Sequence, residues 1–273
     1  MSLLSVSGLT KKYPSFTLDG VSFEIGAGEI VGFIGRNGAG KSTTLKSLMG
    51  FVHPDGGEVR LFGQPFAGES GLKQRIGFVP GGIDYYPKAK LSAITAVTRR
   101  FYESWDEGAY QSCLSDFNLD EKKTPSELSE GMKVKYALTL ALSIRAELLI
   151  LDEPTSGLDP VSRDELLDIF LKLRDGGIGI LFSTHIISDL ERCADRIIYI
   201  REGRICADLP LPEFERSYRL VRYAERPEFA DRLIGERRER DGFTALIKAE
   251  DSAGIISEPA SPEEIMLHLE RKA

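Results

Sequence analysis

One glycine-rich run sets the architecture of the chain: Gly35-Arg36-Asn37-Gly38-Ala39-Gly40-Lys41-Ser42-Thr43. Before it, residues 30–34 are almost entirely apolar, as expected for a parallel strand that is covered on both faces. After it, Leu45, Leu48 and Met49 recur at helical spacing and predict an amphipathic helix. We therefore expect the run to connect a buried strand directly to a helix.

A loop of this composition and position is suited to binding phosphate. Glycines let the backbone turn tightly, so that successive N–H groups point inward at phosphate oxygens. The N-terminus of the following helix adds a partial positive charge. In such a loop Lys41 reaches the β- and γ-phosphates of a nucleotide, and the Ser42 hydroxyl holds Mg²⁺. A chance match in a surface turn is the alternative, but the strand–loop–helix context favours nucleotide binding.

The composition is typical of a soluble globular protein. Of the 273 residues, 42% are hydrophobic and 28% are charged, and the formal net charge is −7. This negative charge argues against general nucleic-acid binding through a basic face. No run approaches the roughly 18 consecutive apolar residues of a membrane span, and no secretory signal is evident. Cys113, Cys193 and Cys206 lack paired or metal-like spacing, so we expect reduced packing thiols in a cytosolic protein.

The order of apolar patterns predicts an α/β protein with a P-loop core. Two β-rich stretches between Leu3 and Glu24 predict an antiparallel β subdomain. A helical pattern over about residues 84–146 interrupts the core, and short apolar runs at residues 148–151, 178–182 and 197–200 then return to parallel strands. We therefore expect one nucleotide-binding domain over residues 1–209, with a helical subdomain inserted into it.

A change of composition after Leu209 predicts a small α+β appendage over residues 210–273. Residues 219–223 and 243–248 are β-like, and the chain is expected to end in a helix. Ser261 is the predicted cap of that helix, with Pro262 at its first position and Glu264 three residues beyond the cap. The charged cluster at residues 236–240 is expected to be a solvated face.

Two adjacent acids, Asp152 and Glu153, follow the apolar run of residues 148–151. In an open α/β sheet, ligands bind at the carboxyl ends of the strands. Asp152 is suited to hold Mg²⁺ through water, and Glu153 to orient or deprotonate an attacking water molecule. An Asp-Glu-Pro sequence can also simply end a strand. Downstream of a phosphate loop, the catalytic interpretation is favoured.

Several further short motifs follow one another along residues 3–209. They are Tyr13, Leu128-Ser129-Glu130-Gly131-Met132, Ser156-Gly157-Leu158-Asp159, and His185 within Ser183-Thr184-His185. With the phosphate loop and the paired acids, they make the chain resemble the ATP-binding subunit of ATP-binding-cassette (ABC) transporters. The resemblance implies that Tyr13 stacks on adenine and that His185 contacts the γ-phosphate. It also identifies Ser129 and Gly131 with a signature motif that faces the ATP bound by a second subunit.

Each of these residues also has a plain structural interpretation. Ser129 precedes a helix that begins near Met132, so it is expected to cap that helix whether or not it binds phosphate. An isolated His185 would more often be a satisfied structural histidine, but it follows a strand on the same edge as Glu153. Tyr13 would be a packing residue without the family pattern.

The sequence departs from the family pattern at two places. The family usually has glutamine after the strand at residues 75–79, where it touches Mg²⁺ and water, whereas here Pro80 is followed by Gly81 and Gly82. Asp84 is a candidate substitute. The signature is the second departure, with Glu130 and Met132 in place of the usual glycine and glutamine, a form that resembles a bacterial exporter-like subgroup.

The resemblance implies an ATP hydrolase that powers a separate transmembrane subunit of an exporter, from the inner face of the cell membrane. Two copies, or one copy with a homologous ABC subunit, would enclose ATP and Mg²⁺. A helix of the membrane subunit would dock near Gly81, Asp84, Tyr85 and Tyr86. The alternatives are a soluble switch acting on ribosomes or DNA, and a regulatory module that scarcely hydrolyses ATP. The acidic single cassette argues against the first, and the intact Lys41 and Glu153 argue against the second.

Overall fold

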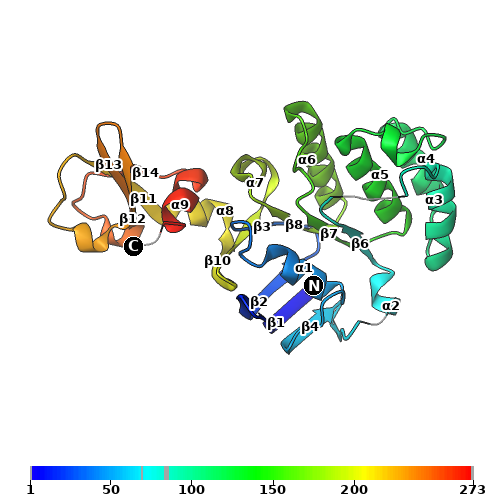
Figure 1. The fold of residues 1–273 in the computed structure, drawn as a ribbon, viewed down its shortest axis with the longest axis horizontal. Helices are drawn as coiled ribbons and strands as arrows, with labels where there is room; N and C mark the ends of the chain where they lie inside the picture. Colours follow the sequence, from blue (N-terminus) through cyan, green and yellow to red (C-terminus); the bar gives the residue numbers. More distant parts are fainter. Residues whose placement is uncertain (1, 69, 83–85, 272–273) are drawn as a thin grey trace. The chain divides into compact units, whose positions relative to one another are not determined.

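The computed structural model describes residues 2–68, 70–82 and 86–271 (Figure 1). The chain divides into two compact units, Met1–Cys206 and Ala207–Ala273, each with its own sheet and helices. The boundary between them falls inside a strand, whereas the sequence placed it after Leu209. Among the described residues, no helix combines the length and the apolar character needed to cross a bilayer.

The first unit is a mixed α/β structure, as the sequence predicts. Its elements are β1 (Ser2–Tyr13), β2 (Phe16–Gly26), β3 (Ile30–Ile34), α1 (Lys41–Leu48), β4 (Gly56–Leu61), β5 (Gln64–Pro65), α2 (Ser70–Lys73), β6 (Ile76–Val79), α3 (Leu91–Thr98), η1 (Arg99–Phe101), α4 (Glu107–Asp116), η2 (Pro125–Glu127), α5 (Glu130–Ser143), β7 (Leu148–Asp152), α6 (Pro160–Asp175), β8 (Gly179–Thr184), α7 (Ile187–Cys193), β9 (Arg196–Arg201) and β10 (Arg204–Pro210).

The central sheet has the strand order β10-β9-β3-β8-β7-β6, and β3 pairs in parallel with both β8 and β9. Every residue of β3, β7 and β8 is buried, which is consistent with their apolar sequences. The polar residues of these strands, Asp152, Ser183 and Thr184, stand at the carboxyl ends of β7 and β8. The register places Ile34 opposite Thr184 and Asp152 opposite Ser183. The three strands therefore end level with one another, and the segments that follow them emerge at one edge of the sheet.

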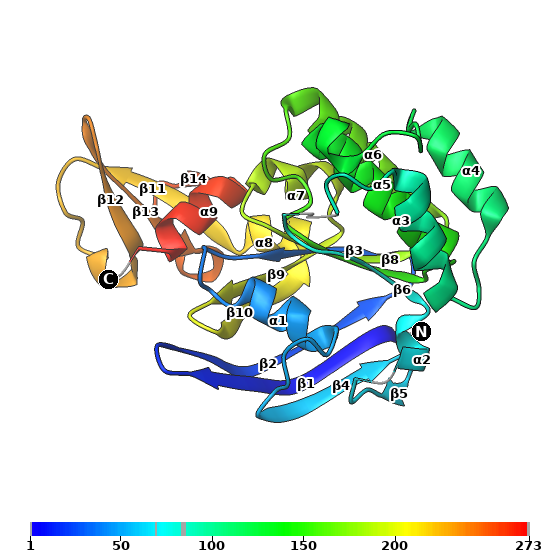
Figure 2. The ribbon, with the colours of Figure 1, turned by 45° about the vertical axis from the view of Figure 1, so that its right-hand side comes forward.

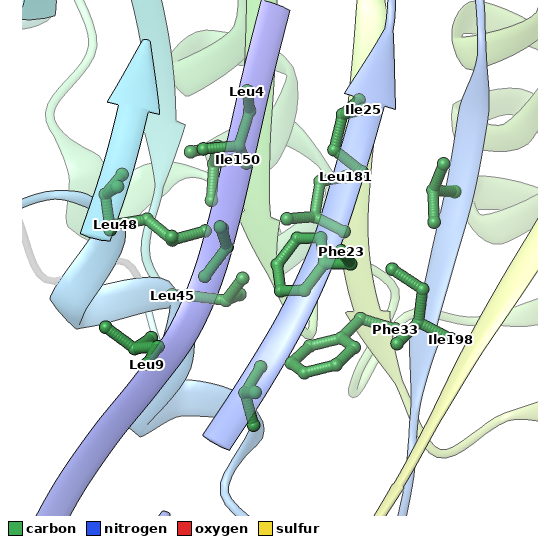
Figure 3. Close-up of a cluster of buried hydrophobic side chains, with 14 of the residues drawn as sticks. Leu4, Leu9, Phe23, Ile25, Phe33, Leu45, Leu48, Ile150, Leu181 and Ile198 are labelled. Carbon is green, nitrogen blue, oxygen red and sulfur yellow. The ribbon is translucent and has the colours of Figure 1, made fainter. Parts of the chain in front are cut away.

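A second sheet, of order β2-β1-β4-β5, packs over the first and encloses the main core. Figure 3 shows Leu4, Leu9 and Phe23 from this sheet directed at Phe33 and other side chains of the central sheet, with Leu45 and Leu48 of α1 filling the space between. All of these side chains are fully or almost fully buried. Burying each of them contributes about 2 kcal/mol, so the helix that follows the phosphate loop is anchored firmly.

Helices α3, α4 and α5 form the predicted helical subdomain around a smaller core of their own (Figure 2). Tyr110 and Tyr136 are buried there, and both hydroxyls lie within hydrogen-bond distance of the Thr95 hydroxyl, at 3.0 and 2.8 Å. The Tyr136 hydroxyl also donates to the carbonyl of Leu91. This buried polar network joins α3 to the two other helices.

The second unit contains α8 (Leu211–Arg216), β11 (Tyr218–Tyr223), η3 (Ala230–Arg232), β12 (Ile234–Glu239), β13 (Gly242–Lys248), η4 (Ala249–Asp251), β14 (Glu258–Pro259) and α9 (Pro262–Leu269). Its antiparallel sheet has the order β12-β13-β11-β14. The predicted capping box of the last helix is confirmed, because Ser261 and Glu264 each accept the other's backbone N–H. The charged cluster at residues 236–240 belongs largely to β12, an edge strand that the sequence pattern did not indicate.

A buried histidine makes the stability of the second unit sensitive to pH. His268 is 2% exposed, and its Nδ1 lies 2.6 Å from the carbonyl oxygen of Gly235, so Nδ1 carries the proton and donates. Burial lowers the pKa of His268, Arg237 and Arg271 lower it further, and the hydrogen bond to Gly235 opposes them. The folded unit thus holds a neutral imidazole, which the unfolded chain protonates below about pH 6.5.

We expect the stabilising contribution of the neutral imidazole to be complete above that pH and to be lost progressively as the pH falls below it, because the unfolded state binds more protons. The midpoint of urea unfolding, followed by circular dichroism, measures the change. His268→Asn keeps a donor for Gly235 near the position of Nδ1 and should abolish most of this pH dependence. The matched control is His53→Asn, an exposed site. Equal pH dependence in the wild type and in His268→Asn would contradict the assignment.

Candidate active site

The loop between β3 and α1 has a backbone that requires glycine at two positions. Gly40 precedes α1 with φ at 115°, a left-handed conformation, and a Cβ there would lie 3.0 Å from the ring of Phe16. At Gly35 a Cβ would lie 2.3 Å from the carbonyl oxygen of Ile200 on β9. The loop can therefore follow this path, with α1 starting at Lys41, only because these side chains are absent.

Lys41, the first residue of α1, directly follows the loop and is 5% exposed. Its Nζ donates to the carbonyl oxygen of Gly35 at 2.6 Å and lies 3.2 Å from Oε1 of Glu153. A buried ammonium needs such partners, because transfer out of water is costly for a charge. Lys41 thus connects the phosphate loop to the segment that follows β7.

Asp152, the last residue of β7, receives two hydroxyl hydrogen bonds on one oxygen. The Ser42 hydroxyl donates to Oδ1 at 3.2 Å, and the Ser183 hydroxyl donates to the same atom at 2.6 Å. The predicted metal ligands Ser42 and Asp152 therefore lie together. They are oxygen donors, the kind that Mg²⁺ prefers, so the residues present fit that ion. Ser183 was not singled out from the sequence, although it lies two residues before His185.

Glu153 is held in a strained backbone conformation. Its φ is 50°, a left-handed value that costs a non-glycine residue about 1–2 kcal/mol. The N–H of Glu153 donates to the Ser183 hydroxyl at 2.9 Å, and its Oε2 lies 2.7 Å from Nδ1 of His185. Because a carboxylate only accepts, Nδ1 is the donor. The two predicted catalytic residues are thus in direct contact.

These residues surround a cleft of about 450 Å³, within the usual range for a small-molecule site. The cleft is lined by Phe16, Arg36, Asn37, Gly38, Gly40, Lys41, Ser42, Thr43, Glu153, Ser156 and His185. The aromatic ring in this lining belongs to Phe16, which the sequence analysis missed. Tyr13 is outside the lining and stacks on Phe16, with ring centroids 6.5 Å apart.

A second cleft, of about 440 Å³, adjoins the first at Ser42, Glu153 and Ser156. It contains Gly81 and Gly82, where the family pattern has glutamine. A Cβ at Gly81 would lie 3.0 Å from the carbonyl oxygen of Asp152, so this glycine packs closely against the end of β7. Asp84, the candidate substitute, and Tyr85 lie outside the described residues.

The signature segment caps α5 but does not enter the phosphate-loop cleft. The Ser129 hydroxyl accepts the N–H of Met132 at 3.3 Å, as expected of an N-cap. Gly131 packs against α6, where a Cβ would lie 3.2 Å from that of Ser162. In the described part of the chain, neither Ser129 nor Gly131 lines either cleft, whereas Glu130 lines the second.

Comparison with known proteins agrees with this geometry. The sequence model of the ABC transporter family matches residues 18–156. The bacitracin transport ATP-binding protein BcrA of Bacillus licheniformis is 31% identical, over 80% of this chain and 73% of its own. The SkfA peptide export ATP-binding protein SkfE of Bacillus subtilis is 35% identical, over 86% of this chain and 98% of its own.

Among solved structures, one described as the ATP-binding subunit of an ABC transporter aligns with a TM-score of 0.71 and 32% identity, over 78% of this chain and 92% of that one. The sequence and the fold are thus similar to those of proteins of one family. The chain therefore belongs to the ABC transporter family, as an ATP-binding subunit that hydrolyses ATP.

Proposed function

We propose that this chain hydrolyses ATP to drive a separate transmembrane subunit in export, from the inner face of the cell membrane. The observation that carries the proposal is the placement of Glu153 between Lys41 and His185, at the edge of the sheet that holds the phosphate loop. Two relatives named for bacitracin transport and for peptide export support the transport role.

Nucleotide binding is assigned to the loop from Gly35 to Thr43. Its N–H groups and the N-terminus of α1 form an anion site, and Lys41 supplies the positive charge. The Lys41 ammonium contacts the Gly35 carbonyl and Glu153. A triphosphate in the cleft would compete with Glu153 for this ammonium, and the carboxylate would then be available to accept a proton from water.

The metal role is assigned to Ser42 and Asp152. Their oxygens already converge, and the Ser183 hydroxyl orients the carboxylate from the other side. Bound Mg²⁺ would neutralise charge that develops on the phosphate oxygens. Hydrogen bonds from residues outside the coordination sphere orient metal ligands, and Ser183 would do so for Asp152.

Catalysis is assigned to Glu153 and His185. One oxygen of Glu153 accepts the proton of the attacking water. The hydrogen bond from Nδ1 of His185 to Oε2 orients the Glu153 carboxylate. Because Nδ1 of His185 is hydrogen-bonded to Glu153, Nε2 is the ring nitrogen that would contact the γ-phosphate. Phe16 and Tyr13 together supply the aromatic surface for adenine.

The site needs a second ABC subunit, either another copy or a homologous chain. Ser129 and Gly131 lie at the N-terminus of α5, outside the phosphate-loop cleft of their own chain. An anion site at a helix N-terminus is suited to the γ-phosphate held by the partner. ATP bound between two chains therefore closes the dimer, and hydrolysis reopens it.

The docking site for the membrane subunit is assigned to an apolar groove beside α3. It is lined by Tyr86, Pro87, Ala89, Ala93, Ile94, Val97 and Thr98. Tyr86 is 81% exposed and Val97 is 56% exposed, which is unusual for large apolar side chains clustered together. A helix of the transmembrane subunit would cover them, as amphipathic helices fill apolar grooves.

Replacing Glu153 by glutamine tests the catalytic assignment. Glu153→Gln keeps the shape and the His185 contact but removes the proton acceptor, so we expect turnover to fall by roughly 100-fold or more. ATP should still bind and should produce a stable dimer on size-exclusion chromatography. Glu147→Gln, at the opposite end of β7, is the matched control and should retain wild-type turnover. Normal hydrolysis by Glu153→Gln would show that another group is the base.

Removal of the Lys41 ammonium tests the binding assignment. Lys41→Ala should lower affinity for a fluorescent ATP analogue by about 30-fold or more, because a charge-assisted hydrogen bond contributes ~2 kcal/mol. Lys172→Ala makes the same charge change at an exposed position of α6 that lines neither cleft, and it should bind within about twofold of the wild type. Equal affinities for the two variants would contradict the phosphate role of Lys41.

We predict that hydrolysis is slow because Gly81 stands where the family usually has glutamine, and that ATP binding is unaffected. Gly81→Gln should raise kcat roughly threefold to tenfold over Gly81→Ala, since one regained polar contact is worth ~1 kcal/mol. The alanine variant is the proper reference because it shares the tight contact with the Asp152 carbonyl. If Gly81→Gln is no faster than Gly81→Ala or the wild type, the glycine is not what limits turnover.

A further inference from the structure

An ion pair between the partly exposed Arg163 and the buried Asp189 is incompletely formed. Among the described residues, the buried side-chain polar atoms without a hydrogen-bond partner are Nε of Arg163 and Oδ1 of Asp189. These two atoms are 3.9 Å apart, and the Asp189 side chain is 1% exposed. Buried polar atoms without partners are rare in proteins and demand an explanation. Here each unpartnered atom faces the other, just beyond hydrogen-bond distance.

The second oxygen of Asp189 reaches the segment that carries Glu153. The Thr155 hydroxyl donates to Oδ2 at 2.6 Å, and Thr155 lies two residues beyond Glu153. Asp189 itself belongs to the first turns of α7, four residues after His185. Burial raises the pKa of Asp189 and the nearby Glu153 raises it as well, whereas Thr155, Arg163 and His185 lower it. One carboxylate thus joins the two segments that hold the catalytic pair.

Arg163 belongs to α6, which packs against both α5 and α7 (Figure 1). The start of α6 contacts the signature segment, since Ser162 packs against Gly131. One turn further, Lys135 of α5 pairs with Glu165 of α6 at 2.6 Å. Residues on either side of Arg163 in the sequence of α6 therefore contact α5, the helix that begins at the signature segment.

We propose that Asp189 is a positioning residue for ATP hydrolysis, which holds the Glu153 and His185 segments in register with α6 through Thr155 and Arg163. The inference rests on the proposed function. When Arg163 moves to about 2.9 Å from Asp189, both unpartnered atoms are satisfied, and the first turn of α6 is locked to the catalytic segments. Closure of the ATP-bound dimer, which acts on the signature segment and α6, would favour this bond.

Asp189→Asn tests the proposal in the full-length chain. An asparagine oxygen still accepts from Thr155, but the charge that attracts Arg163 is lost. We expect kcat for ATP hydrolysis to fall by about 10-fold or more, because small misplacements of catalytic groups are costly. KM for ATP and the affinity for a fluorescent ATP analogue should stay within about twofold, and the thermal midpoint should not fall.

Arg163→Gln should lower kcat to a similar degree, and the double variant should lose little more, as expected when two residues act through one contact. Arg192→Gln is the matched control. Arg192 joins the same two helices on their exposed side, through Asp164 and Asp168, and its loss should leave kcat unchanged.

Wild-type kcat in Asp189→Asn would overturn the inference. So would a loss of kcat that is matched by a fall in the thermal midpoint, or an equal loss in Arg192→Gln, since each indicates a general structural role. A wild-type chain that hydrolyses no ATP would instead overturn the proposed function, and this inference with it.

Discussion

The ion pair between the buried Lys41 ammonium and Glu153 is the contact on which the site depends. It joins the loop after β3 to the segment after β7, two parts of the chain that are distant in sequence. The Lys41 ammonium is 5% exposed, so it would lose much of its hydration uncompensated without a negatively charged partner, whereas Glu153 keeps part of its contact with water. The pair therefore holds the loop after β3 and the proposed catalytic carboxylate together.

The scaffold makes this contact possible through the register of parallel strands. Ile34, Asp152 and Thr184 end their strands level with one another, so loop, carboxylates and histidine emerge at one edge. Beneath them, the core between the two sheets fixes α1, whose first turn carries Lys41 (Figure 3). The glycines of the loop complete the arrangement by permitting close contact with β9. Rigid apolar packing thus sets the distances between polar groups that do chemistry.

Those residues of the site that belong to recognisable short stretches of sequence could be predicted. The phosphate loop, Asp152, Glu153 and His185 each follow an apolar strand, so strand order and strand ends were enough to bring them together. Ser183, Phe16 and the Arg163–Asp189 pair were missed because their importance comes from tertiary neighbours and leaves no local pattern. The positive φ of Glu153 is equally invisible in sequence, since glutamate rarely adopts it. Strand β12 was not predicted because its run of charged residues lacks the alternation of apolar and polar residues that is typical of a strand. Such charged residues are common in edge strands, and β12 lies at the edge of its sheet.

The polar groups of the site satisfy one another. Lys41 contacts one oxygen of Glu153 and His185 the other, while Ser42 donates to Asp152. An anion that enters the cleft must compete with Glu153 for the Lys41 ammonium, which favours a ligand with several negative charges over a singly charged one. Mg²⁺ held by Ser42 and Asp152, as proposed, would compensate part of that charge. The contacts that hold the strained Glu153 in place therefore also favour a multiply charged ligand such as a polyphosphate over simpler anions.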